Sequence, residues 1–179
     1  MVPKDQYKKL EIQAAMKAEI VKFKDFEAYT EVIDEGQRSI PIRWVITEQK
    51  DYGKNQPYNA RLCIREDLEK GKENIRADSP TASKETLKLA LLIAANEGFE
   101  VKCADIKSAF LQGKRLEREI FVKPPPEANA DGKLWLLLQG AYGILDGGRL
   151  FYLRLAEELK QLGFHKVVKT WEHFPSFAT

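Results

Sequence analysis

The sequence predicts an α+β domain, and three patterns support that fold class. Apolar residues recur at helical spacing near the N-terminus, which predicts an amphipathic helix from about Lys8 to Asp25. Two β-type runs, Ile40–Thr47 and Tyr58–Ile64, flank a short polar stretch. A third segment, from Ser83 to Gly98, is rich in leucine and alanine and has helix start and stop signals.

The first half of the chain gives its elements in a clear order. The helical period of the first segment rests on Ile12, Met16, Ile20, Phe23 and Phe26. A strand is predicted from Tyr29 to Ile33. The two runs that follow are bridged by a polar loop containing Gly53 and Pro57, which predicts a long hairpin. The charged segment Arg65–Arg76 predicts an exposed connection.

The leucine-rich helix is expected to be buried. Ser83 is a suitable N-cap and Gly98 a suitable stop. The helix between them is apolar on nearly all sides, which favours burial over a surface position. The β-type run Phe99–Ala104 predicts a buried strand that delivers Asp105 to its C-terminal end.

The second half predicts two short strands and a last helix. The strands are expected near Ile120–Val122 and Leu134–Leu138, and the helix from about Gly148 to Leu162, with Gly163 ending it.

Composition bounds the function without identifying it. The chain of 179 residues has 29 basic and 27 acidic residues, a formal charge of +2, so any contact with nucleic acid must come from a local basic patch. Cys63 and Cys103 lack ligand-like spacing and are expected to be buried, reduced thiols. The polar N-terminus and the absence of a long apolar run predict an intracellular protein that is neither secreted nor membrane-spanning.

Asp105 is the most informative candidate residue. A carboxylate fixed at the end of a strand and followed by an open loop is a common ligand for a hard divalent cation. An Asp in that place also serves as a helix cap or turn former, so the placement alone leaves both interpretations open.

The order of further motifs resembles the reverse transcriptase domain of copia-type retrotransposons. The resembling pieces run from about Ala14 to Phe164. They are Arg43–Thr47, Ala60–Leu62, Asp78–Thr81, Asp105–Gly113, Ile120–Pro125, Leu134–Trp135, Tyr142–Ile144 and Phe151–Leu153 through Leu162–Phe164. No single piece is specific, but the ordered set is.

The resemblance implies the fingers and part of the palm of a polymerase. Residues 1–98 would form the N-terminal helix, the fingers hairpin and a buried helix, and residues 99–179 a partial palm. The reaction would be RNA-directed DNA polymerisation, the transfer of a nucleotide from a deoxynucleoside triphosphate to a primer 3′-hydroxyl. Two magnesium ions would act in it, with Asp105 as catalytic metal ligand and the Ile106 carbonyl sharing an ion. The implied partners are an RNA or DNA template-primer and the rest of a polyprotein.

Further roles follow from the same resemblance. Phe110 would form the floor of the sugar pocket, with Gln112 and Gly113 at its border, although Phe110 is also a plausible core aromatic. Tyr142 and Gly143 would lie against the template, and the alternative for Gly143 is an ordinary turn glycine. Arg61 would bind the triphosphate, and its alternative is a solvated strand residue.

The chain also departs from the family pattern. Asn59 stands where a lysine is usual, and Glu66 where a glycine is usual. The glycines of Asp146–Arg149 replace residues that favour a helix start. The paired aspartates that would provide the second and third metal ligands do not follow Phe164, and His165 and His173 do not form a catalytic pair.

Two functions are therefore expected to compete. The first is a reverse transcriptase fragment, truncated before the catalytic Asp-Asp hairpin and inactive as this chain. The second is a non-catalytic retrotransposon remnant that acts as a weak nucleic-acid or protein-binding module.

Overall fold

The computed structural model of the chain describes residues 1–49, 57–69 and 71–164. Within them the fold is α+β, as the sequence predicts. The helices and strands are α1 (Leu10–Asp25), β1 (Tyr29–Ile33), β2 (Ser39–Glu48), β3 (Tyr58–Ile64), α2 (Lys84–Asn96), β4 (Phe121–Lys123), β5 (Lys133–Leu137) and α3 (Gly147–Gln161). Short 3₁₀ turns lie at η1 (Lys4–Lys8), η2 (Glu66–Leu68), η3 (Lys72–Asn74), η4 (Ala109–Gln112) and η5 (Pro126–Ala128). The hairpin loop around Gly53, both histidines and the tail after Phe164 lie outside the described residues.

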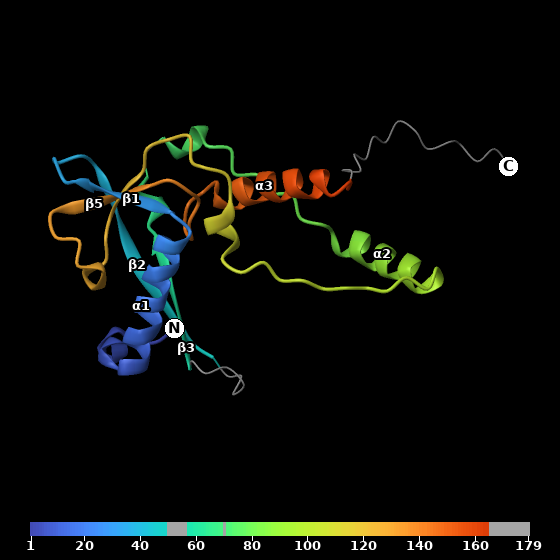
Figure 1. Cartoon of the computed structure of the whole chain (residues 1–179), viewed down its shortest axis with the longest axis horizontal. Helices are drawn as coiled ribbons and strands as arrows, with labels where there is room; N and C mark the ends of the chain where they lie inside the picture. The colour runs from blue at the N-terminus through green and yellow to red at the C-terminus, as the bar shows by residue number, and fades with distance from the viewer. Residues whose placement is uncertain (50–56, 70, 165–179) are drawn as a thin grey trace.

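One sheet organises the described chain, with strand order β1-β5-β4-β2-β3 (Figure 1). The long strand β2 has two partners: Ser39–Pro41 pairs in parallel with β4, and Ile42–Glu48 pairs antiparallel with β3. The predicted hairpin of β2 and β3 is therefore confirmed. The sheet combines strands from both sides of residue 98, because β4 and β5 lie between β1 and β2.

Helix α1 packs its apolar stripe on the hairpin. Ile12, Ala15 and Met16 are buried and form a small core with Ile46 and Ala60 of the two hairpin strands. One and two turns further on, Glu19 and Phe23 are buried as well. The spacing of these positions matches one face of a helix, so the amphipathic pattern of the sequence and the packing agree.

The larger core joins the C-terminal end of α1 to the strands of the sheet, including β5. Trp135 is fully buried, and its ring stacks on Tyr29 at 3.9 Å and on Phe23 at 6.3 Å between ring centroids. Both partners precede it by more than a hundred residues, so this cluster fixes β1 and α1 against β5. Burial of large aromatic side chains is among the strongest stabilising contributions in a domain of this size.

Helix α2 begins and ends where the sequence predicts, but its predicted burial is wrong. The Ser83 hydroxyl accepts a hydrogen bond from the backbone N–H of Thr86 at 3.1 Å, and Gly98 adopts φ +68° after the last turn. The helix has no buried residue, and Leu92 is 67% exposed. It extends away from the sheet, so none of the described elements covers its apolar sides (Figure 1).

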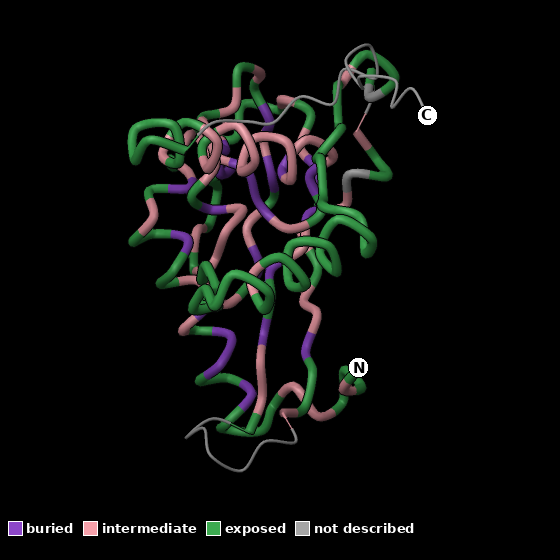
Figure 2. Tube along the Cα trace, turned by 90° about the vertical axis from the view of Figure 1, so that its right-hand side faces the viewer, coloured by how far each residue is buried: buried purple, intermediate pink, exposed green. Residues whose placement is uncertain are grey.

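The predicted strand Phe99–Ala104 is also absent. These residues form no regular structure and are exposed, because no strand of the described sheet lies beside them to accept and donate backbone hydrogen bonds. The predicted burial of Cys103 fails with the strand: Cys103 is exposed, whereas Cys63 on β3 is half-buried. Figure 2 shows the contrast, with buried segments following the sheet and α1 while α2 is exposed.

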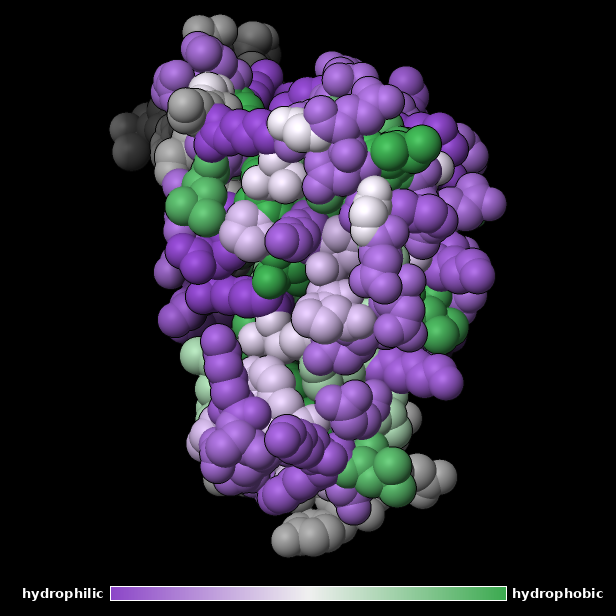
Figure 3. Space-filling view, turned by 90° about the vertical axis from the view of Figure 1, so that its left-hand side faces the viewer, coloured by the Kyte–Doolittle hydropathy of each residue, from purple (hydrophilic) through white to green (hydrophobic). Residues whose placement is uncertain are grey.

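The surface at the sheet end of the molecule is more hydrophilic than that of α2, whose leucines are exposed. The face shown in Figure 3 is mostly hydrophilic, with only scattered apolar patches. Among the described residues, no helix is both long and apolar enough to cross a membrane.

Candidate functional site

A cavity of about 560 Å³ opens where four parts of the chain meet. Helix α1 lines it with Glu19 and Lys22, and the hairpin lines it with Arg61 among other residues. The segment after α2 contributes Asp105, and the loop before α3 contributes Tyr142. Its remaining lining residues are Gln49, Tyr58, Asn59, Lys107 and Ser108. The fold thus brings together three of the predicted site residues, Arg61, Asp105 and Tyr142.

Tyr142 is the centre of this arrangement. The guanidinium carbon of Arg61 lies 5.5 Å from the centroid of its ring, within the range of a cation–π contact. Burial raises the pKa of Tyr142 and the charge of Glu19 adds to this, whereas Arg61 and Lys22 oppose it. The ring therefore lies within the electrostatic reach of two cations and one carboxylate.

Arg61 projects from β3 into the cavity as an exposed side chain. No carboxylate within the described residues forms an ion pair with it, and its guanidinium lies beside the Tyr142 ring. A guanidinium in this state can bind an oxyanion in a two-pronged manner.

Asp105 reaches the cavity from an exposed loop and not from the end of a buried strand. The turn that follows it is fixed locally, because Gln112 Nε2 donates to the Lys107 carbonyl at 2.7 Å and Ser108 adopts a left-handed φ of +52°. The carboxylate is therefore accessible to a ligand in the cavity.

The predicted sugar pocket is divided by the structure. Phe110 is half-buried and packs on Tyr142 in a T-shaped arrangement, with the two ring centroids 5.3 Å apart. It is not among the residues that line the cavity. Ile106, Gln112 and Gly113 line a second cavity of about 830 Å³ against α3. At Gly113 a Cβ would lie 3.0 Å from the backbone nitrogen of Phe151, so this glycine allows close packing on α3.

Gly143 is fixed by its contact with the hairpin. It adopts φ +84°, and a Cβ there would lie 2.2 Å from the Ile64 carbonyl oxygen. The backbone N–H of Ile64 donates to the Tyr142 carbonyl at 2.8 Å. The structure therefore requires a glycine here for close approach of two backbones, and the approach holds Tyr142 beside Arg61.

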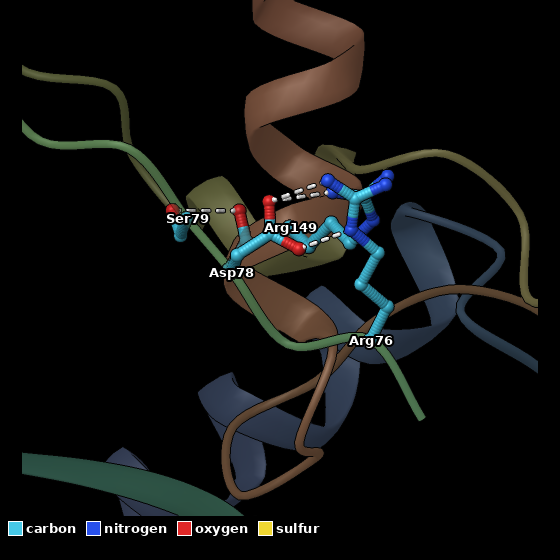
Figure 4. A network of polar contacts seen from close by, with 5 residues as sticks. Arg76, Asp78, Ser79 and Arg149 are labelled. Carbon is cyan, nitrogen blue, oxygen red and sulfur yellow. Dashed lines mark hydrogen bonds and ion pairs between the residues drawn. The ribbon is translucent and has the colours of Figure 1, made fainter. Parts of the chain in front are cut away.

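A polar network ties the connection after β3 to α3 (Figure 4). Asp78 accepts hydrogen bonds from Arg76 at 2.6 Å and from Arg149 at 2.9 Å, and the Ser79 hydroxyl donates to the Gly148 carbonyl at 3.2 Å. The hydrogen bond from Arg76 lowers the pKa of Asp78; desolvation opposes that shift, and the charge of Arg149 adds to it. The network anchors the segment that leads to α2.

Sequence reasoning missed Glu19 and Lys22 as cavity residues. The signal was present, since Glu19 is a charged residue within the apolar stripe of α1. The residue is 2% exposed, and its carboxylate is paired with Lys22 at 3.0 Å.

The cavity does not fit a pair of magnesium ions. Its two carboxylates are Asp105 and Glu19, and Glu19 is already bound to Lys22. Among the described residues, no group of three or more His, Cys, Asp or Glu side chains is placed to hold a metal. Asp105 alone suits one cation that a bound phosphate would also ligate.

Comparison with known proteins agrees with this arrangement of motifs. The profile of the reverse transcriptase (RNA-dependent DNA polymerase) family matches residues 26–174, and the chain belongs to that family. Within it, the relatives are Pol polyproteins of copia-type retrotransposons, so this is a reverse transcriptase domain of copia type. No solved structure matches the chain significantly.

Three relatives define the extent of the likeness. The chain is 28% identical over 164 residues to the retrovirus-related Pol polyprotein from transposon TNT 1-94 of Nicotiana tabacum, a match that covers 88% of this chain and 12% of the relative. It is 25% and 24% identical over 130 residues to the polyproteins from transposons RE2 and RE1 of Arabidopsis thaliana, 70% of this chain and 9% of each relative. The chain thus spans about an eighth or less of these relatives.

Proposed function

We propose that the cavity between α1, the hairpin and Asp105 binds the triphosphate of an incoming deoxynucleotide in the copia-type reverse transcriptase domain. The observation that supports this is the convergence of Arg61, Asp105 and Tyr142 on one cavity from three separate parts of the chain. Arg61 provides the phosphate contact, and Asp105 provides the carboxylate for a magnesium ion held jointly with the phosphates. By family the reaction is RNA-directed DNA polymerisation.

The remaining residues have proposed roles around this centre. The β2–β3 hairpin serves as the fingers, and the sheet region that precedes α3 serves as part of the palm. Phe110 supports the sugar pocket from behind Tyr142, with Gln112 and Gly113 bordering it from the α3 side, and the Ile106 carbonyl shares the cation. Tyr142 and Gly143 face the template. The partners are an RNA or DNA template-primer and the other parts of the polyprotein.

The isolated 179-residue chain is proposed not to extend a primer. In-line nucleotidyl transfer by this chemistry uses two cations about 4 Å apart, clamping the attacking and leaving oxygens. In the described cavity Asp105 is exposed and Glu19 is tied to Lys22, so one carboxylate alone is free to hold a cation. Magnesium-dependent incorporation on an RNA template that Asp105→Asn abolishes would contradict this part of the proposal.

The nucleotide-binding proposal is tested by titrating magnesium·dTTP into the chain. Arg61→Gln is expected to raise the Kd roughly three- to tenfold, because a charge-assisted contact to phosphate is lost from an exposed site. Arg115→Gln is the matched control: it removes an exposed arginine that lines the other cavity, and the Kd should not change. Equal effects of the two variants, or no binding at all, would contradict the proposal.

A second candidate function is a non-catalytic remnant that binds nucleic acid or protein weakly. The uncovered apolar sides of α2 favour this alternative, because large exposed apolar surfaces often mark interaction sites. With a net charge of +2, the chain should bind an RNA–DNA hybrid no more tightly than roughly micromolar, and the binding should fade quickly as salt rises.

A further inference from the structure

Glu19 occupies a position that a packing argument would give to an apolar residue. Its neighbours on the buried face of α1 are Ile12, Ala15, Met16 and Phe23. Glu19 as a whole is 2% exposed, so its side chain has lost almost all contact with water. A buried charge is costly unless a partner compensates it, so the position calls for a specific partner.

Lys22 forms an ion pair with one of the two oxygens of this carboxylate. Its Nζ lies 3.0 Å from Oε2 of Glu19, one helical turn away, while Oε1 is buried without a hydrogen-bond partner in the described part of the chain. The two members differ in exposure: the Glu19 side chain is 3% exposed and that of Lys22 is 47% exposed. The buried carboxylate therefore holds the exposed ammonium beside the cavity that both residues line.

The fixed ammonium and Arg61 approach the cavity from different elements. Lys22 comes from α1 and Arg61 from β3; both line the cavity together with Tyr142, and the charges of both work to lower the pKa of Tyr142. A nucleoside triphosphate distributes several negative charges along three phosphates, so one guanidinium cannot contact all of them. Two cations from separate elements match an extended polyanion better than a single one.

We propose that Lys22, held in place by the buried Glu19, is a second phosphate-binding cation of the nucleotide cavity and acts together with Arg61. This inference rests on the function proposed above and adds a residue to that site. Glu19 is a positioning residue, since it acts through Lys22 and leaves the phosphates to the two cations. The phosphates are those of a free nucleoside triphosphate, and the backbone phosphates of a nucleic acid are the alternative source that the test separates.

The test is a double-mutant cycle on magnesium·dTTP binding, with Lys22→Gln, Glu19→Gln and the double variant. Lys22→Gln is expected to raise the Kd roughly three- to tenfold. That single variant also leaves Glu19 unpaired beside the phosphates, so the double variant is decisive. If Lys22 contacts phosphate, the double variant binds dTTP roughly three- to tenfold more weakly than Glu19→Gln.

Two controls keep the result tied to the phosphate contact. Lys24→Gln removes an exposed lysine of the same helix that does not line the cavity, and it should bind as the unmodified chain does. Lys22→Arg keeps the charge and the pairing with Glu19, and it should retain binding within about twofold. Far-ultraviolet circular dichroism of each variant checks the fold; the conservative variant and the double variant answer the question even where Lys22→Gln unfolds.

Three outcomes overturn the inference. In the first, the double variant binds dTTP as well as Glu19→Gln does, which would mean that Lys22 only neutralises Glu19. In the second, the lysine variants weaken binding of a single-stranded oligonucleotide and leave dTTP binding intact, which would assign the contact to backbone phosphates. In the third, Arg61→Gln weakens dTTP binding while every Lys22 variant leaves it unchanged; the proposed function would then stand without Lys22. Failure of the unmodified chain to bind dTTP is different, since it contradicts the proposed function itself and this inference with it.

Discussion

Helices α1 and α2 are of similar length and both are rich in apolar residues, yet their environments are opposite. One face of α1 packs on the hairpin, and its exposed sides are mostly polar apart from Leu10 and Val21. Helix α2 carries leucines around much of its circumference, and none of its residues is buried. Figure 1 shows the same contrast in space, with α1 beside the sheet and α2 extended away from it.

The difference shows what a hydrophobic pattern does and does not specify. The stripe of α1 is matched by strands about thirty to fifty residues further along the same chain, so the pattern and the packing agree. The apolar pattern of α2 predicts a buried helix, but none of the described elements packs over it and buries its residues. The exposed run Phe99–Ala104 that follows α2 shares that condition. The molecule therefore has a packed body and an uncovered arm, residues 84–104.

The largest effect is expected from truncating the body's central aromatic. Trp135→Ala should lower the free energy of unfolding by roughly 3–5 kcal/mol, because it removes a fully buried ring that stacks on Tyr29. Leu92→Ala in α2 should change it by less than about 0.5 kcal/mol, since the side chain is exposed. Urea unfolding followed by circular dichroism measures both. Similar losses for the two variants would mean that α2 is packed in solution and would remove the distinction.

A smaller loss is expected from Arg118, which joins the connection after β3 to the start of α3. It lies 2.8 Å from Glu69 and 2.5 Å from Asp146, both carboxylates being largely buried. Burial works to lower the pKa of Arg118, but the hydrogen bonds to Asp146 and Glu69 outweigh it and raise the pKa. Arg118→Ala leaves two carboxylates without this partner and should lower the free energy of unfolding by roughly 1–3 kcal/mol.

The matched control for that variant is Arg154→Ala. Arg154 pairs with Glu158 on the exposed surface of α3, where such a pair contributes less than about 0.5 kcal/mol. An Arg118→Ala variant as stable as Arg154→Ala would show that the connection after β3 is not fixed to the body.

The two cysteines report on the two regions directly. Cys103 lies exposed in the arm, whereas Cys63 is half-buried on β3 and burial raises its pKa. A raised pKa leaves less thiolate at neutral pH, so Cys103 should react with a thiol reagent roughly tenfold faster or more. The Cys63→Ser and Cys103→Ser variants, each with one thiol, separate the two rates.

The raised pKa of Cys63 also determines how its contribution to stability changes with pH. Because the folded chain holds Cys63 as the neutral thiol, its contribution to stability is present at neutral pH and is lost as pH rises through the pKa of the unfolded thiol and towards the folded value. Labelling of Cys63 should therefore become fast only as the pH approaches its raised pKa. Equal rates at all pH values would contradict the assignment of the two cysteines to different environments.

The smallest effect on stability, but a visible one on association, is expected from polar substitutions in α2. Leu89 and Leu92 are 58% and 67% exposed, and replacing both with lysine should alter the free energy of unfolding by less than about 0.5 kcal/mol. Exposed apolar surface promotes self-association, so the variant should be more monomeric in sedimentation velocity. A monodisperse unmodified chain would remove the reason for the prediction.

Local sequence signals were sufficient for most elements of the fold. The bounds of β1 and β3 agree with the predicted ranges, and those of α1, α2 and α3 agree within two residues. Caps and periodicity determine these features within a few residues of chain. The failures, the burial of α2 and the strand before Asp105, both depended on partners distant in sequence, which a local pattern does not specify.

The site shows the same limit. The resemblance placed Arg61, Asp105 and Tyr142 in one site, and the cavity joins them. It gave no reason to place Gln112 and Gly113 on the other cavity, against α3. The sequence pattern did not identify Glu19 and Lys22, because a single charged residue on an apolar stripe is a weak signal. The burial of Glu19 is nevertheless what distinguishes α1 from an ordinary packing helix.

The central claim is that the cavity between α1, the hairpin and Asp105 is the nucleotide site, and chemical-shift mapping tests it most directly. Magnesium·dTTP is titrated into ¹⁵N-labelled chain, and the backbone amides that shift are assigned. We expect the shifts to gather at Lys22, Arg61, Asp105 and Tyr142, with residues of the second cavity, such as Arg115 and Glu157, unchanged. Shifts centred on that second cavity, or spread evenly over the basic residues of the surface, would contradict the account.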